Sequence, residues 1–122
     1  MSKYKKTGYL SSFENAYRGI SIVIKSEKNF KIHTIIALIV LLIGIILGFN
    51  YKEIVILILT ISMVLISEML NSAIEFTLDA VYKNKYSKLV GMAKDIAAGA
   101  VMLSATSSVV IGLLLFINKI ID

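Results

Sequence analysis

The chain has 122 residues, enough for one domain over 1–122, and 57% of them are hydrophobic, which argues against a water-soluble globule. It contains no cysteine, which excludes disulfides and thiolate metal sites, and no proline, so long helices can run unbroken. The formal net charge of +5 would suit nucleic acid, but the positions of the basic residues favour a membrane surface instead.

The first predicted element is an amphipathic helix over about residues 10–29. Its apolar residues recur every three or four positions, at Leu10, Phe13, Tyr17, Ile20 and Ile24. A helix with one apolar face and one charged face is expected to lie along a membrane surface. On its polar side Glu14 and Arg18 are four residues apart, a spacing that predicts a surface ion pair.

Three membrane spans are then expected, over about residues 32–49, 54–79 and 91–117. They follow from three stretches without Asp, Glu, Lys or Arg, at 32–51, 54–67 and 96–118, each near the roughly 20 residues that a spanning helix needs. The turn at 50–53 makes the first two spans an antiparallel hairpin. In the first span Gly44 and Gly48 match the spacing of a helix-packing face, although glycine is common in spans.

The basic residues predict the orientation of these spans. They gather in residues 1–31 and 79–95, whereas the 50–53 turn holds only Lys52 and the C-terminal tail only Lys119. Loops rich in Lys and Arg stay in the cytoplasm. The sequence therefore predicts a multi-pass cell-membrane protein with its N-terminus in the cytoplasm and its C-terminus outside. The lysines are explained by anionic lipid, without nucleic acid as a partner.

Carboxylates enter the otherwise apolar second span on one helical face. Glu68, Ser72, Glu75 and Asp79 follow an i, i+4, i+7, i+11 pattern, with Asn71 alongside. Acidic groups inside a span are costly and by default mark a functional site. Carboxylate and amide oxygens also suit Mg²⁺ and the phosphates that it carries. This face is where we expect the chemistry.

Further charged residues are expected at the same depth in the membrane as this face. Glu68 lies roughly 21 Å along the second span, near the inner edge of a hydrocarbon core about 30 Å thick. Glu27 precedes the first span at that edge, and Lys94 and Asp95 begin the third. The only histidine, His33, is interpreted as an interfacial anchor.

Such a cluster suits phosphoryl transfer from a soluble nucleotide to a lipid hydroxyl at the cytoplasmic interface. In this interpretation Glu68 is the base, Glu27 and Glu75 hold Mg²⁺, and Lys94 pairs with phosphate. There is no Gly-x-x-x-x-Gly-Lys-Ser/Thr motif, which excludes a P-loop fold. A small oligomeric ion- or proton-coupled transporter is the alternative from another class, but it would need no phosphate-binding lysine.

Two motifs resemble the signature of the prokaryotic diacylglycerol kinase family, which comprises small three-span membrane kinases. They are Glu68-x-Leu70-Asn71-Ser72-Ala73-Ile74-Glu75 with Asp79, and Gly91-x-Ala93-Lys94-Asp95. The segment from Ser26 to His33 resembles a third family segment. Its Asn-Phe-x-Ile-His form, with the run at 94–101, is most similar to the Gram-positive branch, the undecaprenol kinases. The resemblance covers roughly residues 12–105.

The resemblance implies a homotrimer with active sites between neighbouring subunits, ATP as phosphate donor and Mg²⁺ as cofactor. It implies Glu68 as the catalytic base and Glu27 with Glu75 as metal ligands. The implied nucleotide-binding residues are Asn15, Glu27, Asn71, Glu75, Lys94 and Asp95, with Lys85, Tyr86 and Ser87 of the loop nearby.

The acceptor implied by the closer branch is undecaprenol, which would become undecaprenyl phosphate. The alternative is a diacylglycerol kinase that makes phosphatidic acid. In the diacylglycerol-specific enzyme an arginine stands near the N-terminus where this chain has Gly8.

Overall fold

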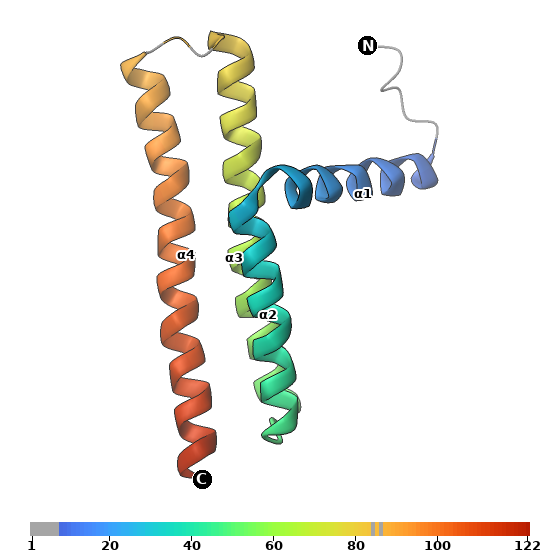
Figure 1. Ribbon diagram of the computed structural model, residues 1–122, viewed down its shortest axis with the longest axis vertical. Helices are drawn as coiled ribbons and strands as arrows, with labels where there is room; N and C mark the ends of the chain where they lie inside the picture. The colour runs from blue at the N-terminus through green and yellow to red at the C-terminus, as the bar shows by residue number, and fades with distance from the viewer. Residues whose placement is uncertain (1–7, 84, 86) are drawn as a thin grey trace.

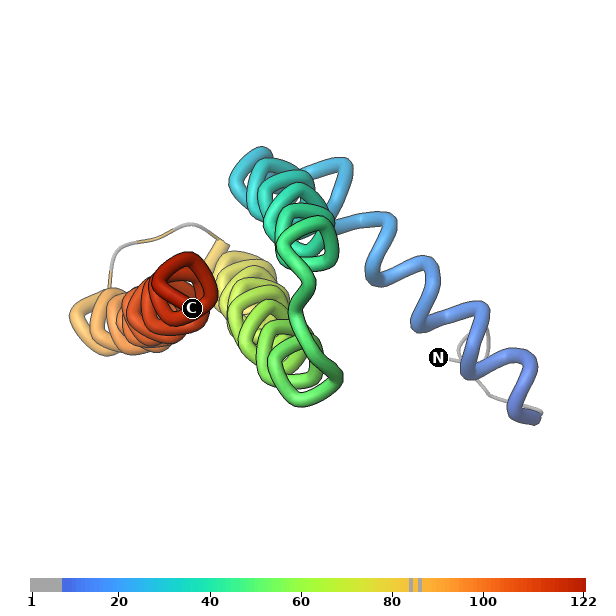
Figure 2. Tube along the Cα trace, turned by 90° about the horizontal axis from the view of Figure 1, so that it is seen from below, coloured from blue at the N-terminus to red at the C-terminus, as the bar shows by residue number. Residues whose placement is uncertain are grey.

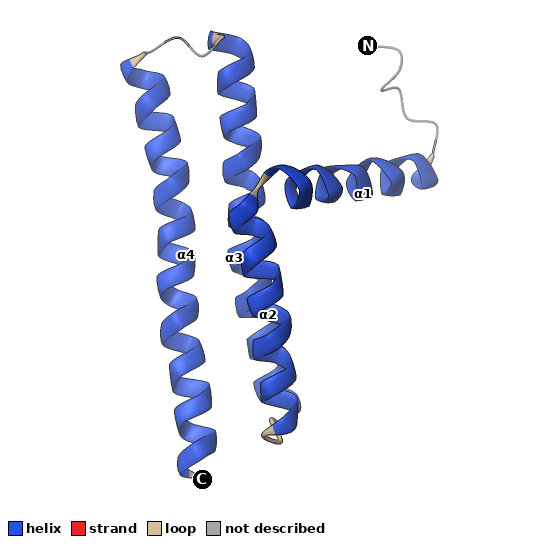
Figure 3. Cartoon of the chain, viewed as in Figure 1, coloured by secondary structure: helices blue, strands red, loops and turns tan. Residues whose placement is uncertain are grey.

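A computed structural model describes residues 8–83, 85 and 87–122, and every regular element in these ranges is an α-helix (Figure 3). The helices are α1 (Tyr9–Ser26), α2 (Lys28–Ile46), α3 (Tyr51–Tyr82) and α4 (Lys88–Ile121). Helix α3 packs against both α2 and α4, while α1 leaves this bundle sideways (Figures 1 and 2). Helices α2, α3 and α4 are each long and apolar enough to cross a membrane, which confirms the prediction of an all-helical chain with three such helices.

The first two helices meet at a sharp elbow. The helix expected over 10–29 ends at Ser26, because Glu27 adopts an extended backbone, with φ −112° and ψ 103°. Glu27 is thus both the C-cap of α1 and the N-cap of α2. No proline or glycine marks this break in the sequence. The elbow sends α1 away from the bundle and holds Glu27 at the start of α2.

Helix α2 ends at Ile46, three residues before the predicted end of the first span. Gly48 has φ +85°, a conformation that side chains with a Cβ rarely adopt. The Gly48 N–H donates to the Ile45 carbonyl and the Phe49 N–H donates to the Gly44 carbonyl, which is the Schellman pattern of a helix end. Gly48 therefore ends the helix, and Gly44 leaves room for the Phe49 ring and for Leu57 of the neighbouring helix.

The next helix begins with a capping box. The Asn50 side chain accepts from the Glu53 N–H at 2.9 Å, and the Glu53 carboxylate accepts from the Asn50 N–H at 2.9 Å. Glu53 also lies 3.0 Å from Lys119 of α4. The rings of Phe49 and Phe116 stack with their centroids 4.8 Å apart. These contacts fasten α4 to the α2–α3 turn and set the register of the three helices.

Unequal helix lengths define two levels of the bundle. Helix α2 has 19 residues and α3 has 32. At about 1.5 Å per residue α2 is about 28 Å long, close to the thickness of a hydrocarbon core. Since the two helices share the turn at 47–50, the last part of α3 continues past the elbow beside α4 (Figure 1).

Gly44→Ala should lower the free energy of unfolding relative to Gly112→Ala. A Cβ at Gly44 would meet Cδ2 of the buried Phe49 ring at 3.0 Å, whereas nothing lies within 4 Å of a Cβ at Gly112. Both variants gain the helix preference of alanine, so the difference isolates the clash, at about 1–3 kcal/mol. Unfolding in detergent followed by circular dichroism measures it, and equal stability would show that Phe49 is not tightly held.

Candidate active site

The predicted acidic face of α3 faces both neighbouring helices. Glu68 and Ser72 are buried, and Glu75 and Asp79 are half-buried. Glu68 contacts α2, and Asp79 contacts α4. The face therefore runs from the membrane-length part of the bundle into the part beyond the elbow.

At the deeper end of this face Glu68 lies against His33 of α2. Nδ1 of His33 and Oε1 of Glu68 are 2.6 Å apart, within ion-pair distance, although the geometry is not that of a hydrogen bond. The side chain of Glu68 is 10% exposed and that of His33 is 39% exposed. The sequence suggested an interfacial anchor for His33. The sequence did contain a signal for this contact, because His33 and Glu68 lie at comparable distances along the chain from the turn at 47–50.

Polar atoms around Glu68 lack partners within the described part of the chain. Oε2 of Glu68 and Oδ1 of Asn71 are buried without a hydrogen bond. Leaving such an acceptor unpaired costs about 1–3 kcal/mol. Because Asn71 follows Glu68 by three residues, both side chains lie on neighbouring positions of α3. This part of the helix has the unused hydrogen-bonding capacity of a binding site.

Beyond the elbow a cleft of about 270 Å³ lies between the ends of α3 and α4. Its lining includes Asp79, Lys85, Ser87 and Lys94. Nζ of Lys94 donates to Oδ1 of Asp79 at 2.7 Å, and both side chains are more than one-third exposed. An ion pair this exposed contributes little to stability and can exchange partners readily. Three predicted nucleotide-site residues thus share one cleft, while Tyr86 lies outside the described residues.

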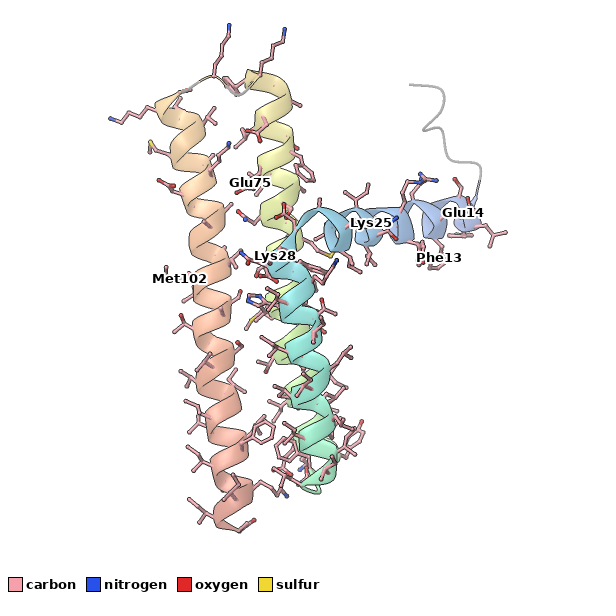
Figure 4. The ribbon with its side chains drawn as sticks, in the orientation of Figure 1. Phe13, Glu14, Lys25, Lys28, Glu75 and Met102 are labelled. Carbon is pink, nitrogen blue, oxygen red and sulfur yellow. The ribbon has the colours of Figure 1, made fainter. Side chains whose placement is uncertain are left out.

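The two predicted metal ligands come from different parts of the fold. Glu27 is half-buried at the elbow, and Glu75 is half-buried on α3. Figure 4 shows Glu75 on the loop side of the elbow, which is marked by Lys28. No group of three acidic or histidine side chains within metal-binding reach occurs among the described residues. Mg²⁺ is commonly held by one or two carboxylates plus waters and substrate phosphates, so this donor set fits it without a third protein ligand.

Two other predicted residues lie apart from this cluster. The side chain of Asn15 accepts a hydrogen bond from Arg18 at 2.9 Å, and this bond replaces the predicted Glu14–Arg18 ion pair. Its neighbour Glu14 lies towards the outer end of α1, away from the bundle (Figure 4). Asp95 is exposed on α4. A single chain therefore does not bring Asn15 to Glu68.

The fold and this cluster define a class: a small multi-pass membrane protein with a buried carboxylate and a basic cleft at one end of its bundle. Residues 14–116 match the family described as prokaryotic diacylglycerol kinase, and the chain belongs to that family.

Two relatives are similar over most of this chain. The undecaprenol kinase of Bacillus subtilis is 39% identical over 112 residues, which cover 92% of this chain and 90% of the relative. The diacylglycerol kinase of Synechocystis is 37% identical over 103 residues, which cover 84% of this chain but only 59% of the relative. The family predicted from the sequence motifs is thereby confirmed.

Proposed function

We propose that this protein is an ATP-dependent lipid kinase that transfers the γ-phosphate to the hydroxyl of undecaprenol, with residues 1–122 acting as one domain. The observation that carries the proposal is the buried Glu68 carboxylate, one oxygen of which has no partner among the described residues. Membership of the prokaryotic diacylglycerol kinase family and the Bacillus subtilis relative support the same conclusion.

The level of Glu68 in the bundle suits a lipid alcohol. Glu68 contacts His33, which lies six residues after Glu27. His33 belongs to α2, the helix whose length matches the hydrocarbon core. A lipid lying beside α2 and α3 would present its headgroup oxygen near this level. The apolar side chains below would contact its tail, and burial of the tail contributes about 25 cal/mol per Å².

Phosphoryl transfer requires the acceptor hydroxyl to lose its proton. Oε2 of Glu68 accepts this proton as the acceptor oxygen bonds to the γ-phosphorus. The bond from that phosphorus to the β–γ bridging oxygen breaks, and ADP leaves. Glu27 and Glu75 would hold Mg²⁺, which would offset the negative charge of the phosphate that is transferred.

The cleft beyond the elbow suits the nucleotide. Lys94 would exchange Asp79 for a phosphate oxygen, and Lys85 and Ser87 of the same lining would add a cation and a hydroxyl. Asn71 and Glu75 lie between this cleft and Glu68 along α3. Asp95, exposed one position further on α4, would meet the nucleotide from outside the cleft.

Assembly as a homotrimer would complete the site. Asn15 is carried on a helix that extends away from its own bundle, as a residue serving a neighbouring subunit would be. Helix α1 would lie on the cytoplasmic membrane surface, which its basic residues favour. The active site would then face the cytoplasm, where ATP is available, and the C-terminus would lie outside.

A diacylglycerol kinase that makes phosphatidic acid is the second candidate, favoured by the Synechocystis relative. Undecaprenol is preferred because the Bacillus subtilis relative matches along nearly its whole length. The family resemblance supports this choice, since it implies an arginine in a diacylglycerol-specific enzyme where this chain has Gly8. A prenol offers a single headgroup oxygen, so its site needs no further donors for a glycerol backbone.

Glu68→Gln should reduce kcat for phosphate transfer by roughly 10²–10⁴-fold, because the amide cannot accept the hydroxyl proton. Transfer of radiolabelled phosphate from ATP to undecaprenol in micelles measures the loss. Glu14→Gln, which changes an exposed acid on α1, is the control and should keep wild-type turnover. Near wild-type turnover of the Glu68 variant would contradict its assignment as base.

Glu27→Gln and Glu75→Gln should each shift the activity curve to higher free Mg²⁺, because each removes an anionic oxygen ligand. The measurement is a Mg²⁺ titration at saturating ATP and lipid. Glu14→Gln, an exposed acid on α1, serves as the control and should leave the curve unchanged. If both test variants also follow the wild-type curve, the two carboxylates do not bind the metal.

A further inference from the structure

The contact between His33 and Glu68 joins two helices at the proposed base. His33 lies on α2 and Glu68 on α3, and the 2.6 Å approach of Nδ1 to Oε1 is the only ion pair of Glu68 in the described part of the chain. A carboxylate buried at membrane depth is costly unless a donor or cation compensates it. His33 is the residue that supplies this compensation.

We propose that His33 is a positioning residue for Glu68: its Nδ1–H holds Oε1, so that Oε2 points to the acceptor hydroxyl. The inference rests on the proposed kinase function and extends it to a residue outside the predicted site. Since Oε1 faces His33 and Oε2 is buried with no partner in the part of the chain that the structure describes, the two carboxylate oxygens already have different surroundings.

The neighbouring groups leave this role to His33. The adjacent hydroxyl of Thr34 donates to the Phe30 carbonyl at 2.8 Å and is therefore occupied within its own helix. Lys94 is held by Asp79 of α3, eleven residues beyond Glu68. Catalytic hydrogen bonds are often poorly aligned without substrate and tighten when it binds, which accounts for the short but misaligned contact.

In this arrangement the Nδ1 proton stays on His33 throughout. The proton of the acceptor hydroxyl moves to Oε2 of Glu68 as the new oxygen–phosphorus bond forms and ADP departs. His33 thus exchanges no proton with the substrate and acts only by orienting the carboxylate and stabilising its charge.

The test compares His33→Asn with His33→Leu. Asparagine keeps an N–H near the position of Nδ1, whereas leucine keeps apolar bulk without a donor. We expect kcat for undecaprenol phosphorylation to fall about 10²-fold in the leucine variant and to stay within about tenfold of wild type in the asparagine variant. The KM for ATP should be unchanged in both, because the nucleotide cleft lies beyond the elbow.

A wild-type kcat in His33→Leu would overturn the proposal. So would an equal loss in both variants, because the donor would then not be what matters. A raised KM for ATP with unchanged kcat would make His33 a nucleotide contact and would overturn it too. If the wild-type protein phosphorylates no lipid alcohol at all, the proposed function itself is wrong, which is a distinct result.

Thermal unfolding of His33→Leu, Glu68→Gln and the double variant tests the contact without reference to activity. Two side chains that interact give shifts of the unfolding midpoint that do not add, whereas independent residues give additive shifts. We expect non-additive shifts for this pair. Additive shifts would show that His33 does not hold Glu68.

Discussion

A carboxylate that leaves water must be compensated, and the burial of Glu68 at membrane depth sets this requirement for the rest of the bundle. Its Oε1 is met by His33, while Oε2 has no partner within the described chain. An apolar residue would fill the same space at lower cost. In the proposed function the cost is offset when a lipid hydroxyl binds, because the free oxygen is where the hydroxyl proton must go.

Register decides which groups meet Glu68. The Schellman end of α2 and the capping box of α3 fix the turn at 47–50, and the Glu53–Lys119 ion pair attaches α4 to the same end. Counted from that end, His33 reaches Glu68, and further along Lys94 reaches Asp79. Both contacts therefore lie along one face of α3, and in the proposed function they mark the level of the lipid and the level of the nucleotide.

The sequence predicted the all-helical class, the three apolar helices and the family, because charge-free stretches and the Glu68–Glu75 and Lys94–Asp95 motifs are local patterns. It did not predict the break at Glu27, where no proline or glycine interrupts the helix, nor the contact between His33 and Glu68, which depends on the register of two helices. It also did not predict that Gly48 ends α2 through its backbone conformation, or that Gly44 leaves room for Phe49 and for Leu57 of α3. The sequence also did not predict that Asn15 lies apart from the other site residues of its own chain, because its helix points away from the bundle.

The central claim is that this chain phosphorylates a polyprenol and that Glu68 is the base. It is tested most directly by measuring kcat/KM of the purified protein for undecaprenol and for dioleoylglycerol, with ATP and Mg²⁺ in one detergent. The account predicts phosphate transfer with the higher kcat/KM for undecaprenol. A preference of tenfold or more for dioleoylglycerol, about 1.4 kcal/mol in transition-state binding, would contradict the assigned acceptor, and no transfer to either lipid would contradict the kinase.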